Sequence, residues 1–401
     1  MKPVSLPIYA DVKAAAEKPT GWPVLRLGFR PFYLGGTLLA AFVVPLWVAM
    51  LLGGLPLKPV LPSLWWHAHE MLFGFAVAII IGFLLTAGKN WTGLATPRGP
   101  VLGALVMLWL AARLAALGNS VLLFAILDVA LLPLVALIFA SLLIRARNYR
   151  NLPLALILML LAASNALFHL AASGRMDIAV MAPLYAGLAL ITLVESIIAG
   201  RVIPAFTMAA SPGLRLVASP VVERLTLGLT ALAMMLWVVM PTGRVSASVL
   251  LAAAVAHTWR FFGWRTWLTW GRPIVWVLHA AYAWIPVALC LLAASQLGWL
   301  SVTAGVHALG VGATGGLIIG MVTRTARGHT GRSLVVSRAE VLAYALVMVA
   351  AFSRVLASLL SPQFYAAFLV LATATWTLAF LIYLWKYTPW LLQTRLDGKD
   401  D

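Results

Sequence analysis

The chain has 401 residues, of which 63% are hydrophobic and only 10% are charged. A soluble domain of this length needs many more charged side chains to cover its core, so the composition excludes a soluble globular protein. The formal net charge of +17 does not indicate nucleic-acid binding, because the chain contains no soluble domain to carry a basic patch. The sequence therefore predicts an integral membrane protein in contact with lipid.

Twelve apolar runs follow one another along the chain, and each is long enough to cross the ~30 Å hydrocarbon layer of a bilayer. We expect transmembrane helices at residues 33–55, 67–87, 101–118, 121–143, 152–173, 180–200, 222–240, 246–262, 273–297, 299–323, 339–360 and 364–385. The prediction is an all-α protein with a single transmembrane domain. It consists of a cytoplasmic N-terminal segment (1–32), a twelve-helix bundle (33–385) and a cytoplasmic C-terminal tail (386–401).

The lysines and arginines are divided unequally between the two sides of this bundle. Of the 28, three lie in the loops after odd-numbered spans and two lie within spans, which leaves 23 in the termini and the loops after even-numbered spans. Basic residues concentrate on the cytoplasmic side of membrane proteins. We therefore expect both termini in the cytoplasm and, in a bacterium, a location in the inner membrane.

The second and tenth spans resemble each other. An ungapped alignment of residues 69–93 with 307–331 has seven identities, at His69/His307, Gly74/Gly312, Ile80/Ile318, Ile81/Ile319, Gly82/Gly320, Thr92/Thr330 and Gly93/Gly331. Both segments carry small residues at four-residue spacing, a pattern that permits close helix packing. If the sixth span is a middle copy, the chain consists of three pseudo-symmetric four-helix units.

Six of the seven histidines lie within or at the ends of predicted spans, where ionisable residues are costly and indicate a functional site. His69 and His307 are each about two turns or less below the outer surface, and His169 reaches the same level. His67 and His69 point to roughly opposite sides, because each helical residue turns by about 100°. For any one histidine, the alternative role is a neutral side chain hydrogen-bonded to a neighbouring helix.

Two histidines at equal depth on different helices can ligate a haem iron from both sides. We therefore expect His69 and His307 to be axial ligands of a haem, and His67 with His169 to be an alternative outer group. Any haem is expected to be non-covalent, because the single cysteine excludes a CxxCH attachment motif.

A second set of histidines lies near the cytoplasmic side. His257 and His279 are each five or six residues from the same turn, so they can meet. His329, in the loop sequence RGHTGR, can complete a three-histidine copper site with them, because imidazole suits copper. We expect copper or a second haem at this inner level. Alone, His329 is instead a solvated or phosphate-binding loop residue.

Five charged residues within the spans are further candidates. Arg113 and Arg354 lie at outer depth and can pair with haem propionates or extend to the lipid headgroups. Glu70 follows His69 and can orient it, accept a proton or act as an acid in the first helical turn. Asp128 and Glu195 can line a proton path or pair with polar neighbours.

Several motifs resemble those of one family over essentially the whole chain. They are LGFRPFYLGG, WWHAHEMLFGFAVAIIIGFLLTAGKNWTG, GRVIPAFTMAA, LHAAYAWIP and HALGVGATGGLIIGMVTRTARGHTGR. The chain resembles the NnrS family of twelve-helix bacterial inner-membrane proteins. That resemblance implies haem b, copper and a role in the response to nitric oxide.

A more distant resemblance is to the catalytic subunit of haem–copper oxidases and nitric oxide reductases, in which the corresponding helices hold a low-spin haem. It favours His69 and His307 as the axial ligands. The chain departs from that family because its sixth and seventh spans contain no histidine, so the second metal site of that family has no counterpart here.

Together these observations predict a haem protein in nitric oxide defence that binds or reduces nitric oxide with electrons from quinol. The alternatives are a non-enzymatic haem or copper carrier, a transporter and a redox sensor.

Overall fold

The computed structural model describes residues 21–240 and 242–399, and these form helices without a strand. Residues 1–20 of the predicted cytoplasmic N-terminal segment lie outside the described residues. Eleven helices are long and apolar enough to cross a membrane, and Gly99–Ala115 is a shorter apolar helix. Its 17 residues reach about 26 Å, close to the thickness of the hydrocarbon layer. The prediction of about twelve transmembrane helices is confirmed.

Nine spans are single helices and three are composite. The single helices are α1 (Phe29–Leu51), α4 (Gly99–Ala115), α5 (Val121–Arg145), α6 (Leu152–Ala172), α7 (Met181–Ala210), α8 (Pro220–Val239), α9 (Arg244–Gly263), α14 (Arg338–Leu359) and α15 (Tyr365–Leu392). The second span joins α2 (Ser63–His69), the π-helix η2 (Glu70–Ala76) and α3 (Val77–Thr92). The ninth joins α10 (Pro273–Tyr282) and α11 (Trp284–Gln296), and the tenth joins α12 (Val302–His307), the π-helix η5 (Ala308–Gly315) and α13 (Gly316–His329).

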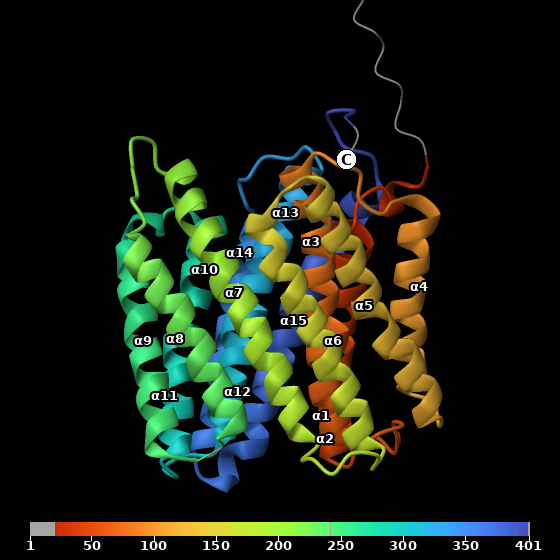
Figure 1. Cartoon of the computed structure of the whole chain (residues 1–401), viewed down its shortest axis with the longest axis vertical. Helices are drawn as coiled ribbons and strands as arrows, with labels where there is room; N and C mark the ends of the chain where they lie inside the picture. Colours follow the sequence, from red (N-terminus) through yellow and green to blue (C-terminus); the bar gives the residue numbers. More distant parts are fainter. Residues whose placement is uncertain (1–20, 241, 400–401) are drawn as a thin grey trace, which may run out of the picture.

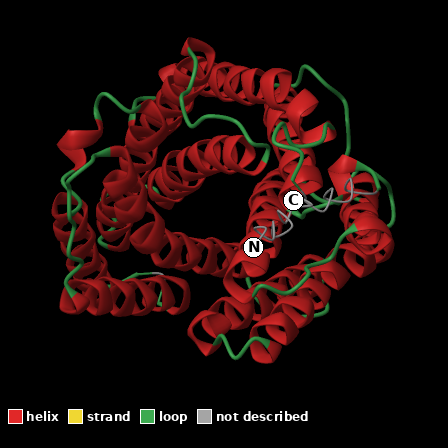
Figure 2. Cartoon of the chain, turned by 90° about the horizontal axis from the view of Figure 1, so that it is seen from above, coloured by secondary structure: helices red, strands yellow, loops and turns green. Residues whose placement is uncertain are grey.

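The spans form one bundle in which neighbours along the chain pack together and the last helix, α15, packs against the first, α1. Helices α4 and α5 lie on one side of the bundle, and α8, α9 and α11 lie on the other (Figure 1). Seen from above, the helices form one bundle and are joined by loops (Figure 2). The second and tenth spans are the most deeply buried, and α7 contacts the π-helix of each. The three-unit organisation stays a prediction.

The first and last helices extend beyond the apolar runs that predicted them. Helix α1 begins at Phe29 instead of residue 33, and α15 continues to Leu392 instead of residue 385. Arg30 explains part of this difference. Its buried guanidinium donates from Nη1 to the carbonyl of Leu391 at 2.9 Å. A charged residue inside α1 therefore supplies a hydrogen-bond donor to a backbone carbonyl in the last turn of α15.

The resemblance between the second and tenth spans extends to their backbones. In both, a π-helix begins at the residue after the matched histidine, His69 or His307. In both, the matched glycine at the other end, Gly93 or Gly331, has a positive φ, at 69° and 75°. A π-helical turn inside a longer helix is rare in proteins, and many of the known examples lie at functional sites.

The small-residue stripes bring helices together, as their spacing predicts. A Cβ atom on Gly312 would lie 2.5 Å from the ring of Trp284 on α11, and one on Gly82 would lie 3.0 Å from Phe32 on α1. The glycines therefore allow the two central spans to approach their neighbours closely.

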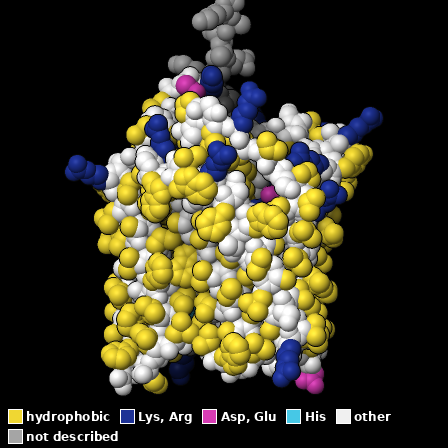
Figure 3. Space-filling model, turned by 90° about the vertical axis from the view of Figure 1, so that its left-hand side faces the viewer, with side chains coloured by type: hydrophobic (Ala, Val, Ile, Leu, Met, Phe, Trp, Pro, Cys, Tyr) yellow, Lys and Arg dark blue, Asp and Glu magenta, His cyan; other side chains and the backbone are white. Residues whose placement is uncertain are grey.

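Apolar side chains cover the middle of the molecule (Figure 3). On the face shown, lysines and arginines gather mainly toward the end where α15 finishes. An apolar band between polar ends is the surface expected of a protein that spans a bilayer.

Candidate metal and cofactor sites

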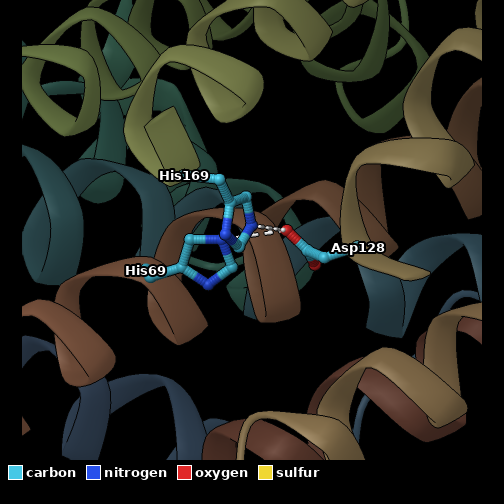
Figure 4. Close-up of side chains that lie close together, drawn as sticks. All are labelled: His69, Asp128 and His169. Carbon is cyan, nitrogen blue, oxygen red and sulfur yellow. Dashed lines mark hydrogen bonds and ion pairs between the residues drawn. The ribbon is translucent and has the colours of Figure 1, made fainter. Parts of the chain in front are cut away.

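Three side chains able to bind a metal converge from three helices (Figure 4). His69 ends α2, Asp128 lies on α5 and His169 lies on α6. The Nε2 atoms of the two histidines are each 3.0 Å from the same oxygen of Asp128, Oδ2. One candidate ligand atom from each residue lies within 4.8 Å of the others, and all three residues are buried. We call these residues the His–Asp cluster.

Three polar residues enclose the His–Asp cluster. Oε1 of Glu70 lies 3.2 Å from Nδ1 of His69. Arg113 donates to Glu70 at 2.5 Å and also to Asp128, so one arginine joins both carboxylates. Asn165 donates to Asp128 at 2.7 Å. Glu70 and Asp128, which the sequence presents as separate candidates, therefore belong to one site with His69 and Arg113.

Aromatic rings separate the cluster from the rest of the bundle. Ring centroids of three phenylalanines lie 4.8–5.2 Å from that of His69, and they belong to Phe73, Phe124 and Phe168. Gly74 provides space for the guanidinium, since a Cβ there would be 3.0 Å from Nη1 of Arg113. Apolar walls of this kind strengthen the electrostatic interactions inside.

A cavity of about 430 Å³ forms the second site, and two histidines and an arginine lie on its wall. They are His67, His307 and Arg354, and we call this space the histidine cavity. The His67 ring stacks on Trp47 with centroids 3.9 Å apart and an interplanar angle of 15°. Met71, whose thioether is a further candidate ligand, also lies on the wall.

The hydrogen bond of His307 determines how its ring can act. Its Nδ1 lies 2.8 Å from the backbone carbonyl of Thr303, one turn earlier on the same helix. Since a carbonyl only accepts, Nδ1 carries the proton and Nε2 is left with a lone pair. Histidines that ligate metals are commonly held in this way, by a carbonyl or carboxylate on the other ring nitrogen.

The structure does not bring the outer histidines together in the predicted pairs. His69 belongs to the His–Asp cluster, whereas His307 lies on the histidine cavity. The alternative pair is divided as well, because His67 lies on the cavity and His169 in the cluster. His67 and His69 lie at different places in the bundle, as the rotation of about 100° per helical residue predicts. The two arginines are likewise divided, with Arg113 at the cluster and Arg354 at the cavity.

The inner histidines contact hydroxyl groups rather than one another. His257 lies 2.8 Å from Oγ1 of Thr230 and 2.7 Å from the Tyr282 hydroxyl. His279 lies between Thr207 and Thr266, at 2.9 and 3.1 Å. The contacts of each ring therefore fit the alternative role, a neutral histidine bonded to neighbouring helices.

His329 is at the end of α13 and not in the following loop, and its ring centroid lies 5.4 Å from that of Phe29 on α1. The inner pair packs instead on α8, α7 and the 3₁₀ turn η4 (Thr266–Thr269). The described contacts do not assemble the predicted three-histidine site.

Glu195 lies beside a smaller cavity of about 80 Å³ with otherwise apolar walls. Its Oε2 atom is buried and has no hydrogen-bond partner among the described residues. Thr314 lies on the walls of both this cavity and the histidine cavity, so the two cavities are neighbours. The place of Glu195 on a proton path stays a prediction.

Sequence analysis missed Asn165, Thr303 and Trp47. Asn165 precedes His169 by four residues and so shares its helix face, a spacing that could have identified it. The same spacing separates Thr303 from His307, but the contact there is through a backbone carbonyl, which any residue supplies. Trp47 comes from another helix, and no sequence signal connects it to His67.

Fold and sites together define a polytopic membrane protein with histidines gathered at a buried polar cluster and at a cavity within the bundle. The family model described as NnrS protein matches residues 23–395, nearly the whole chain, and the chain belongs to the NnrS family. Comparison with curated proteins finds no match. Membership of the family supports a role related to the nitric oxide response.

Proposed function

We propose that the histidine cavity holds a haem b and that the protein acts in nitric oxide defence through it. The observation that carries the proposal is the orientation of His307. Its Nδ1 is bonded to the Thr303 carbonyl, which leaves Nε2 available as a ligand on the wall of a cavity of about 430 Å³. Cofactor sites typically occupy about 300–1,000 Å³ and combine apolar walls with a few polar groups.

The other residues of the cavity fit the same cofactor. Arg354 is a cation on its wall and suits a propionate carboxylate. His67 is a second imidazole, and its buried Nδ1 has no hydrogen-bond partner within the described part of the chain. Stacking on Trp47 fixes the plane of that ring. The residues present thus supply an oriented ligand, a second imidazole and a charge partner.

A bound haem would supply an iron that binds nitric oxide and exchanges electrons, with a potential set by its ligands and surroundings. The protein's own contribution is to orient His307, pair the propionates with Arg354 and exclude water with apolar walls. The optical spectrum of the unchanged protein beside that of His67→Ala would show whether His67 is a second iron ligand. A low-spin spectrum that is lost in His67→Ala would assign His67 that role, and a high-spin spectrum of the unchanged protein would leave a position open for nitric oxide.

The test is the ratio of haem to protein after purification in detergent. His307→Ala should lose most of the haem because it removes the oriented ligand. His257→Ala is the matched control, since it removes another buried histidine of the same bundle, bonded to Thr230 and Tyr282. Equal haem in His307→Ala and the unchanged protein would refute the assignment.

For the activity, we propose that nitric oxide is bound or reduced with electrons from membrane quinol. Purified protein supplied with quinol should consume nitric oxide through many turnovers. Uptake that stops near one equivalent per haem would instead identify a carrier, transporter or sensor.

We also propose a bacterial inner-membrane location with both termini in the cytoplasm. The unequal division of lysines and arginines supports it, as does their gathering toward one end of the face in Figure 3. A reporter that is active only in the cytoplasm should be active when fused after Asp401, and inactivity of a stably expressed fusion would contradict the orientation.

A further inference from the structure

The three residues of the His–Asp cluster are spaced as ligands around one ion. Each histidine Nε2 lies 3.0 Å from Oδ2 of Asp128. Nitrogen and oxygen ligands lie about 2.0–2.2 Å from a transition-metal ion, so two ligands at right angles are about 3.0 Å apart. Both nitrogen–oxygen separations therefore match those of two ligands in one coordination sphere, and the three candidate atoms lie within 4.8 Å of one another.

The surroundings of His69 indicate that a cation belongs between these atoms. Its Nδ1 faces Glu70, while its Nε2 faces both Asp128 and the amide oxygen of Asn165, at 3.0 Å each. A neutral imidazole has one N–H, and carboxylates only accept. If Nδ1–H donates to Glu70, then Nε2 directs a lone pair toward two oxygens. A cation at that point converts repulsion into attraction.

The charges of the cluster also favour a bound cation. Glu70 and Asp128 are two carboxylates, and among the described residues Arg113 is the one cationic side chain that contacts both. With neutral histidines the group carries one uncompensated negative charge within the membrane bundle, where charge is costly. A proton on His69 would balance this charge but would engage a single imidazole. A divalent metal ion would change the net charge of the group from −1 to +1, and it would engage His169 as well, whose Nε2 faces the same oxygen.

We propose that His69, Asp128 and His169 bind a first-row transition-metal ion, and that Glu70 orients His69 for it. Two imidazoles and one carboxylate suit iron(II), copper(II) and zinc(II). A carboxylate on the far ring nitrogen of a ligating histidine fixes its tautomer and increases its basicity, which is the role the contact gives Glu70. This site is separate from the histidine cavity and does not depend on a haem there.

The first experiment measures iron, copper, zinc and manganese per chain in the purified protein, with haem iron determined separately. It is repeated after one equivalent of copper(II) is added as a probe and excess is removed. We expect about one non-haem metal ion per chain, as one such site requires. The bound copper should show nitrogen couplings from two imidazoles in its electron paramagnetic resonance spectrum.

Two variants assign the site. His169→Gln should lose the metal while keeping an amide that can contact Asp128. Glu70→Gln should weaken copper binding by about 10–100-fold, the usual effect of removing a group that orients a ligand. His257→Gln, the matched control at the inner level, should retain full metal content. Size-exclusion profiles and haem content establish that each variant is folded.

Three results would overturn the proposal. They are no non-haem metal before or after copper addition, equal metal in His169→Gln and the unchanged protein, or loss of metal from the His257→Gln control. The haem proposal fails separately, because His307→Ala should lose haem and keep this metal. A protein with the metal and without haem therefore contradicts only the cavity assignment.

Discussion

His67 and His69 are two residues apart on one helix, yet they lie at different sites. Each residue turns the helix by about 100°, so the two side chains leave α2 in nearly opposite directions. One ring stacks on Trp47 at the histidine cavity, and the other contacts Asp128 in the His–Asp cluster. A single short sequence, WWHAHE, thus contributes a histidine to each site.

Arg113 is the residue whose loss should most disturb the cluster. Substitution Arg113→Gln leaves Glu70 and Asp128 as buried carboxylates without their cationic partner, and breaking a buried ion pair costs about 3–5 kcal/mol. Thermal unfolding in detergent should show a lower midpoint for Arg113→Gln. Arg175→Ala, at an exposed position, is the control and should match the unchanged protein. Equal stability of both variants would contradict the pairing described here.

At the scale of elements, the two π-helical segments are the feature that hydropathy could not predict. Apolar runs identify a membrane helix whatever its hydrogen-bond register, so η2 and η5 were expected as ordinary helix. The repeat did indicate that the two places are alike, through His69/His307 and Gly74/Gly312. The backbone confirms that likeness, since each π-helix begins directly after its histidine.

Gly312 tests the close packing of the tenth span. A methyl group there would lie 2.5 Å from the Trp284 ring, so Gly312→Ala forces α11 and η5 apart. Overpacking of this kind costs about 1–3 kcal/mol. Thermal unfolding should therefore show Gly312→Ala destabilised. Gly228→Ala is the control, because nothing lies within 4 Å of its added methyl group. A destabilised control and an unaffected Gly312→Ala would reverse the expectation.

For the whole molecule, the sequence predicted the helices well and the pairing of the histidines poorly. Hydropathy reports which residues can lie in lipid, and it located all twelve spans, but it placed the beginning of α1 too late because Arg30 is charged. The rise per residue gives depth, which correctly grouped His69 with His169. It does not say which helices face one another. The lateral packing of the helices places His307 on the cavity that His67 also lines, whereas His69 lies in the His–Asp cluster.

We propose that the outer histidines belong to two separate sites and that the haem lies in the histidine cavity. The most direct measurement is the haem content of purified His69→Ala beside that of His307→Ala, each relative to protein. We predict that His69→Ala retains its haem and His307→Ala loses it. Loss of haem in His69→Ala with retention in His307→Ala would instead place the haem at the His–Asp cluster.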